Sequence, residues 1–172
     1  MATVEEHTQG KIRDLPISQA LRAVLLSAAH ASGVDLVKVT SGGQCRRGTC
    51  TKRTGSERHD DGQAADLQLL VGGRALKFTS GGDLETFKSF VTAAARAGAM
   101  GLGAGVDYMG PDTIHVGFGS RAVWGAGGKA ANAPEWIRRA AQSGWQGVAL
   151  ADDSVELEEL DSPDEEIEED HA

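Results

Sequence analysis

SERHDDGQAAD, residues 56–66, is the stretch around which the rest of the chain is organised. It sets His59 seven positions before Asp66, with a glycine and alanines between them, and a second histidine, His115, ends the later run DTIH at residues 112–115. Two imidazoles and one carboxylate suit zinc, and a hydrolytic zinc ion keeps three protein ligands and one open position. The sequence therefore predicts a Zn²⁺ site made of His59, Asp66 and His115.

Amide hydrolysis at such a site needs a group that accepts a proton from the metal-activated water and passes it to the leaving nitrogen. Asp112 is predicted to be this general base. A residue three positions before His115 in a regular strand would point to the opposite face, so this role requires Asp112 to lie in a turn after Pro111. The alternative is an ordinary Pro-Asp turn residue.

The developing oxyanion needs a hydrogen-bond donor beside the metal. Gln44 is predicted for this role, because it follows the end of a predicted strand that abuts the site. An arginine with a formal charge could do the same work. The alternatives are Arg46, Arg47 and Arg58.

The pattern His59-x-x-Gly62-x-Ala64-x-Asp66 followed by Asp112-x-x-His115 resembles the zinc D-Ala-D-Ala carboxypeptidase superfamily. That superfamily includes vancomycin-resistance dipeptidases, the metal domain related to hedgehog, and phage L-alanyl-D-glutamate endolysins. In it the first histidine, the aspartate and the last histidine hold zinc, and the acid three positions before the last histidine is the base. The aspartate at that position is more similar to the phage endolysins, since the dipeptidases use glutamate.

The resemblance spans residues 34–119 and implies a zinc peptidase that cuts an amide bond in the peptide moiety of bacterial peptidoglycan. It also implies a hedgehog-like fold and a phage or virion context. Gln44 stands where many members carry arginine, and VGFG follows the last histidine at residues 116–119. These departures support an alternative hypothesis, a non-catalytic zinc-containing binding or structural module of the virion type.

Periodicity predicts an α+β fold, a small antiparallel sheet flanked by helices. Residues 1–16 read as an irregular lead-in, and a long loop over 41–62 delivers His59. Trp124, Trp136 and Trp145 are predicted to pack the C-terminal segment, with a glycan or peptide groove as the alternative. Predicted helices cover 18–32 with Ser18 as N-cap, 83–98 with Asp83 as cap, and 134–143; predicted strands cover 34–40, 64–71, 74–78, 101–108 and 113–118.

Charge divides the chain into two parts. All 17 lysines and arginines precede residue 140, whereas 12 of the 25 acids fall in 152–172, so residues 1–151 carry a net charge of +4. Residues 152–172 contain too few apolar side chains to form a hydrophobic core of their own. We expect a zinc peptidase-like domain at 1–151 and a disordered acidic tail at 152–172 that is solubilising, occupies the basic body or binds an unknown partner.

Other function classes are less well supported. No run approaches the ~20 apolar residues that span a membrane, and the N-terminus lacks the pattern of a signal peptide, so synthesis in the cytoplasm and action on the cell wall after release are expected. The basic run 46–53 lacks interleaved aromatic residues, which argues against nucleic acid as a partner. Cys45 and Cys50 are predicted to be free thiols, with a local disulfide as the alternative.

Overall fold

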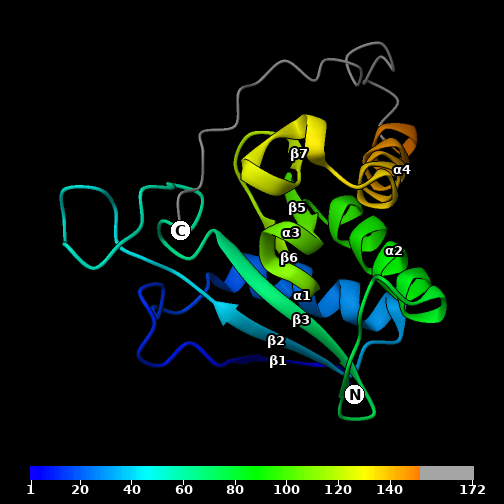
Figure 1. Cartoon of the computed structure of the whole chain (residues 1–172), viewed down its shortest axis with the longest axis horizontal. Coiled ribbons are helices and arrows are strands. Elements are labelled where there is room, and N and C mark those ends of the chain that lie inside the picture. The colour runs from blue at the N-terminus through cyan, green and yellow to red at the C-terminus, as the bar shows by residue number, and fades with distance from the viewer. Residues whose placement is uncertain (152–172) are drawn as a thin grey trace.

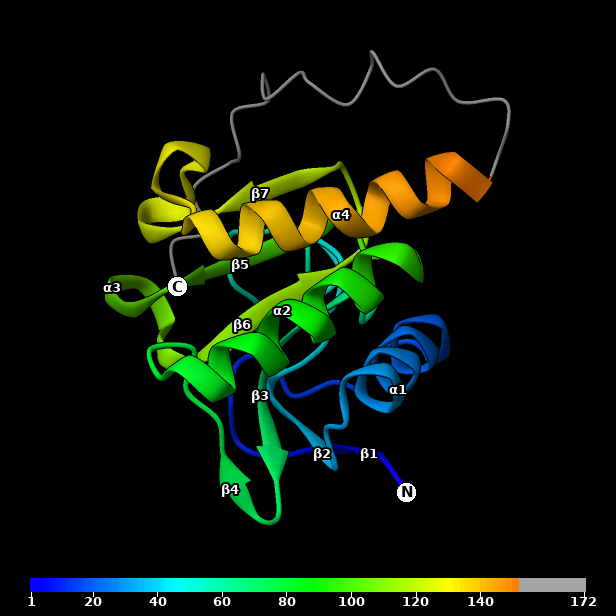
Figure 2. The same ribbon diagram turned by 90° about the vertical axis from the view of Figure 1, so that its right-hand side faces the viewer.

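The computed structural model describes residues 1–151, so the predictions for an acidic tail at 152–172 lie outside the described residues. Within them the chain forms one mixed sheet, in the order β1-β2-β3-β6-β5-β7, with β4 paired to β3. Helices α1, α2 and α4 lie side by side over one face of this sheet (Figures 1 and 2). The strands are β1 (Thr3–Glu6), β2 (Leu36–Ser41), β3 (Ala64–Val71), β4 (Arg74–Ala75), β5 (Gly101–Gly105), β6 (Gly110–Gly117) and β7 (Ala122–Trp124).

Helix α1 (Gln19–Ser32) forms where the sequence predicts it. The Ser18 hydroxyl accepts a hydrogen bond from the Leu21 backbone N–H at 3.1 Å, which satisfies one of the unpaired donors of the first turn. Gly33 ends the helix in the left-handed conformation, with φ of 76°. The stripe of buried residues along this helix packs into the core.

Helix α2 (Gly81–Arg96) begins two residues before its predicted start, and Asp83 is not its cap. The residue at the N-cap position is Ser80. The Asp83 carboxylate instead accepts two 2.8 Å hydrogen bonds from the Arg74 guanidinium and one from the Lys77 backbone N–H. Asp83 therefore ties the helix to β4. Helix α4 (Glu135–Ala151) begins after Pro134 as predicted but continues past residue 143.

The prediction of a small antiparallel sheet was wrong, although the α+β class is confirmed. β1 runs parallel to β2 at one end of the sheet, and β7 runs parallel to β5 at the other. Only Val4 is buried in β1, so the alternation that indicates a strand is nearly absent there. β7 is too short to give a pattern, and the predicted strand 101–108 ends at Gly105, where the short helix α3 (Val106–Met109) begins.

Alternation along the central strands separates a core face from an open face. In β3, Ala65, Leu67 and Leu69 belong to the hydrophobic core beneath the helices. Asp66 and Gln68 therefore point to the other face. No helix in residues 1–151 is long and apolar enough to cross a membrane.

Candidate metal centre

The candidate site lies on a single row of residues across the open face of the sheet. Asp66 on β3 pairs with Ser41 on one side and with His115 on the other. His115 pairs with Gly103 on β5, which pairs with Trp124 on β7. Side chains in one row of a sheet share a face and lie next to each other. The sheet register therefore brings Asp66 and His115 together although 49 positions separate them in the chain.

His59 comes from the loop that follows β2, which Figure 1 shows in cyan beyond the end of that strand. Backbone hydrogen bonds from Gln44 N to His59 O (3.1 Å) and from Asp61 N to Gln44 O (2.9 Å) hold the two sides of the loop together. Gly62 has φ of 73°, and a Cβ there would lie 2.5 Å from the Pro16 carbonyl oxygen. Only glycine fits this turn, which leads the chain from the loop into β3.

The three side chains converge on one point. Asp66 Oδ1 lies 3.1 Å from His115 Nδ1 and 3.8 Å from His59 Nε2, and one ligating atom of each residue lies within 4.8 Å of the others. Ligands at about 2.0–2.1 Å from a tetrahedral zinc ion lie roughly 3.4 Å apart. The observed spacings bracket that value, so His59, Asp66 and His115 can hold a metal ion.

The protonation states also suit a metal. Burial lowers the pKa of His59 to about 4, against the opposing effect of the Asp66 charge. Burial acts to raise the pKa of Asp66, but the two histidines and Arg13 outweigh it and bring this pKa to about 2. At neutral pH His59 is therefore a neutral imidazole and Asp66 an anion, the forms that bind metal ions.

The hydrogen bonds of the two imidazoles indicate which nitrogen atoms could bind a metal. His59 Nδ1 donates a 2.8 Å hydrogen bond to the Gly42 carbonyl oxygen, which leaves Nε2 as the atom with a lone pair. Within residues 1–151, His59 Nε2 and His115 Nε2 are buried and have no hydrogen-bond partner. Buried polar atoms are normally paired, so His59 Nε2, which lies 3.8 Å from Asp66 Oδ1, marks a place where a ligand is expected. His115 directs Nδ1, and not Nε2, at Asp66 Oδ1.

Asp112 was expected in a turn that precedes the strand of His115, but it lies inside β6. β6 is nevertheless irregular here, because Ile114 pairs with Ala104 while Gly110 pairs with the next residue of β5. Asp112 Oδ2 accepts a 3.1 Å hydrogen bond from Gln68 Nε2. Gln68 lies two residues along β3 from Asp66, on the same open face. The irregular start of β6 therefore lets the Asp112 carboxylate reach the face that carries the metal ligands.

The structure assigns Gln44 a different role from the predicted oxyanion donor. Gln44 is 1% exposed, and its amide nitrogen donates to Ser56 O at 2.6 Å and to Asp60 Oδ1 at 2.8 Å. Its amide oxygen accepts from the Thr54 backbone N–H at 2.9 Å. Both amide hydrogens are already used, so Gln44 stabilises the loop that carries His59 and has no hydrogen left for an oxyanion.

Among the alternative donors, Arg58 is connected to His115 through the Trp124 ring. Its guanidinium carbon is 4.6 Å from the centre of the Trp124 ring, and that ring lies 4.8 Å from the His115 ring. Arg46 pairs with Asp61 on the exposed part of the loop, and Arg47 with Glu57.

Two residues beside the candidate metal site were not predicted from the sequence. Arg13, in the segment read as an irregular lead-in, is 5% exposed and contacts Asp66. Trp124 packs over Gly103 against His115, so its predicted role in the C-terminal segment was wrong. No spacing rule points to Arg13, whereas the alternating glycines at 101, 103 and 105 could have indicated a large side chain lying across them.

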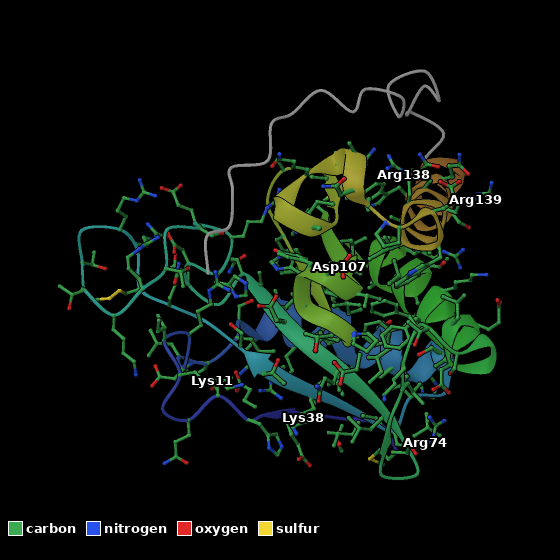
Figure 3. All side chains as sticks on the ribbon, in the orientation of Figure 1. Lys11, Lys38, Arg74, Asp107, Arg138 and Arg139 are labelled. Carbon is green, nitrogen blue, oxygen red and sulfur yellow. A yellow bond between two sulfur atoms is a disulfide. The ribbon has the colours of Figure 1, made fainter. Side chains whose placement is uncertain are left out.

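Cys45 and Cys50 form a disulfide, so the prediction of free thiols was wrong (Figure 3). Their Cα atoms are 6.2 Å apart. The bridge closes the tip of the loop one residue after Gln44, where the fold brings the two cysteines together.

Comparisons with known proteins leave the chain unassigned to a family. No protein-family model matches it, and searches of curated proteins and of solved structures find no match.

Proposed function

We propose that this chain is a zinc-dependent peptidase that hydrolyses an amide bond in the peptide moiety of bacterial peptidoglycan. The observation that carries the proposal is the convergence of His59, Asp66 and His115, together with the buried, unpaired Nε2 of His59 that faces Asp66. Two imidazoles and one carboxylate favour zinc over calcium or magnesium, which prefer oxygen ligands.

The substrate class rests on the resemblance of the sequence to the zinc D-Ala-D-Ala carboxypeptidase superfamily. The order of the chemical residues, His59, Asp66, Asp112 and His115, is that of the superfamily motif. The hedgehog-like fold and the phage endolysin context belong to the same proposal. The aspartate at position 112 favours an endopeptidase of the L-alanyl-D-glutamate type over a dipeptidase.

Three residues of the chain have separate roles in the proposed hydrolysis. A bound zinc ion supplies Lewis acidity for the attack of water on the amide carbonyl. Asp112 takes the proton from the attacking water and delivers it to the leaving nitrogen. Gln68 holds the Asp112 carboxylate through its 3.1 Å hydrogen bond and so orients the base. Arg58, stacked on Trp124, stabilises the charge that develops on the carbonyl oxygen.

The test begins with purified protein and purified sacculi. The proposal predicts one zinc ion per chain and release of soluble muropeptides, whose masses identify the cleaved bond. Asp112→Asn should retain zinc and lose turnover. Wild-type turnover in that variant would remove Asp112 as the base, and absence of zinc from the wild-type protein would overturn the whole proposal.

A second candidate is a zinc-containing module that binds without turnover. It is favoured by the burial of the ligands, because the side chains of His59 and His115 are 0% and 1% exposed. Structural zinc sites are closed in this way, whereas catalytic sites keep an accessible position. Tight zinc binding without any muropeptide release from sacculi would favour this candidate, and measurable turnover would exclude it.

A further inference from the structure

Arg13 contacts the candidate metal site, yet none of the steps of the proposed hydrolysis uses it. Its side chain is 6% exposed, and its Nη1 lies 3.4 Å from Asp66 Oδ2. The other carboxylate oxygen, Oδ1, faces His115 Nδ1 at 3.1 Å and His59 Nε2 at 3.8 Å. The two oxygens of Asp66 therefore have separate partners, with the histidines on one side and the arginine on the other.

The backbone of Arg13 reaches a second ligand. Its carbonyl oxygen accepts a 2.8 Å hydrogen bond from the Gly42 backbone N–H. The Gly42 carbonyl oxygen in turn accepts the 2.8 Å hydrogen bond from His59 Nδ1 that leaves His59 Nε2 facing the site. Arg13 thus acts on Asp66 through its side chain and on His59 through its main chain.

Arg13 is itself held in place by the loop. Thr54 Oγ1 accepts hydrogen bonds from Arg13 Nη2 at 2.7 Å and from Nε at 3.2 Å. The Thr54 backbone N–H donates to Gln44 Oε1 at 2.9 Å. A planar guanidinium can bond Thr54 with one edge and still direct Nη1 at the carboxylate, which a lysine ammonium on a flexible stem cannot do.

We propose that Arg13 is a positioning residue for the metal centre: it engages Asp66 Oδ2 so that the carboxylate offers only Oδ1 to the ion. A carboxylate without this partner is free to rotate and to present both oxygens, which would take up the position needed by water. Groups that orient metal ligands in this manner typically change metal affinity by about 10–100-fold when they are replaced. This inference rests on the zinc site of the proposed function.

The positive charge of Arg13 acts against metal binding, whereas its orientation of Asp66 favours metal binding. A guanidinium beside a divalent cation repels it, so removal of the charge alone would strengthen metal binding. Arg13→Lys separates the two effects, because lysine keeps the charge and loses the fork that bonds Thr54 and Asp66 together. Arg13→Gln removes both.

The experiment measures zinc affinity by competition with a chelator, and the visible absorption of the Co²⁺-substituted protein, which reports the coordination of the metal. Arg13→Lys should bind zinc about 10–100-fold more weakly and change the intensity of the Co²⁺ spectrum. Thr54→Val, which removes the hydroxyl that holds Arg13, should shift both readouts in the same direction by less. Arg22→Lys is the matched control, because Arg22 pairs with Glu6 away from the metal ligands; it should leave both readouts unchanged.

The outcomes separate this inference from the proposed function. If wild-type protein binds zinc and both Arg13→Lys and Thr54→Val match it in affinity and Co²⁺ spectrum, the positioning role is wrong and the zinc site stands. Wild-type affinity in Arg13→Lys with tighter binding in Arg13→Gln would mean that the arginine acts by charge alone, which also overturns the proposal. A wild-type protein that binds no zinc refutes both. Should Arg13→Lys fail to fold by circular dichroism, Thr54→Val decides the question.

Discussion

Asp66 and His115 are direct partners in the ladder between β3 and β6, and Asp66 Oδ1 lies 3.1 Å from His115 Nδ1. Two of the three candidate metal ligands are thus placed by the central strands, whose hydrogen bonds hold their relative positions. The third, His59, depends on a loop held by Gln44, Gly62 and the segment before α1. The sheet therefore fixes the relative positions of Asp66 and His115, whereas the position of His59 depends on the folding of its loop.

Asp66→Asn should abolish stoichiometric zinc binding, because the amide lacks the negative charge that the ion requires and the two imidazoles alone do not complete the ligand set. Zinc content after dialysis, measured by atomic emission, tests this. His30→Ala is the control, because His30 is an exposed residue near the end of α1 and should bind zinc like the wild type. Retention of one zinc ion per chain in Asp66→Asn would place the metal elsewhere.

Asp112→Asn should lower turnover on sacculi by about 10²–10⁴-fold with zinc content unchanged, because general acid-base catalysis contributes rate enhancement of that size. The measurement is the rate of muropeptide release at saturating protein. Asp107→Asn provides the matched control, an exposed acid in α3 that should retain full activity. Equal losses in the two variants would assign the effect to surface charge and not to a base.

Without metal, the free energy of unfolding should fall as the pH drops from 6.5 towards 4. Burial holds the pKa of His59 at about 4 in the folded protein, whereas the unfolded chain takes up a proton near 6.5. Between these values the unfolded state binds more protons, so acid destabilises the fold, by on the order of 3 kcal/mol over the whole window. Urea unfolding in the presence of a chelator at pH 7.5 and pH 4.5 measures the change.

The control for the pH experiment is His30→Gln, which should keep the full pH dependence. His59→Gln should lose most of it, because no titratable group then remains at that position. A wild-type protein equally stable at both pH values would show that His59 is not held in its neutral form by the fold.

Local signals explain which elements could be predicted from the sequence. Ser18 and Gly33 mark the ends of α1 because capping depends on residues next to each other in the chain. The same holds for the stretch at 59–66, where the loop-to-strand junction and the small residues are encoded within a few positions. The group of His59, Asp66 and His115, which could hold a metal ion, could be predicted because the chemistry and spacing of these residues are visible in the sequence itself.

Features that depend on tertiary contacts could not be predicted. β1 and β7 are strands only because longer strands lie beside them, and their own residues give little pattern. The roles of Gln44 and Arg13 depend on partners at 54–60 and 66, which the fold brings to them. Asp112 lies within β6, and its carboxylate reaches Gln68 on the open face through the irregular pairing between β5 and β6, which is not encoded in the residues around Pro111 alone.

Replacement of Cys45 and Cys50 by serine should lower the free energy of unfolding by about 2 kcal/mol, the loss expected when a short closed loop is opened. The loop that carries His59 should be affected most, because Gln44 adjoins the bridge and bonds to His59 O. Urea unfolding of the double variant measures the loss. A reducing agent should produce the same loss in the wild-type protein and none in the variant; a reducing agent that leaves the wild type unaffected would argue against the bridge.

Gly103→Ala should displace Trp124 and disturb the metal centre from the far end of the row. A Cβ at Gly103 would lie 2.5 Å from Trp124 Nε1, and Trp124 is 1% exposed with its ring 4.8 Å from the ring of His115. A buried indole has no room to yield, so overpacking should cost about 1–3 kcal/mol of stability and weaken zinc binding. Thermal unfolding, tryptophan fluorescence and zinc affinity provide the three readouts.

The matched control is Gly82→Ala in the first turn of α2, where a Cβ would meet nothing within 4 Å. This change should leave zinc affinity and fluorescence unaltered. It should not lower stability, because the unfolded chain has less conformational entropy with alanine than with glycine at this position. Gly103→Ala with the zinc affinity and fluorescence of the control would show that Trp124 can move without consequence for His115. Trp124 would then fill space beside β5 without affecting the position of His115.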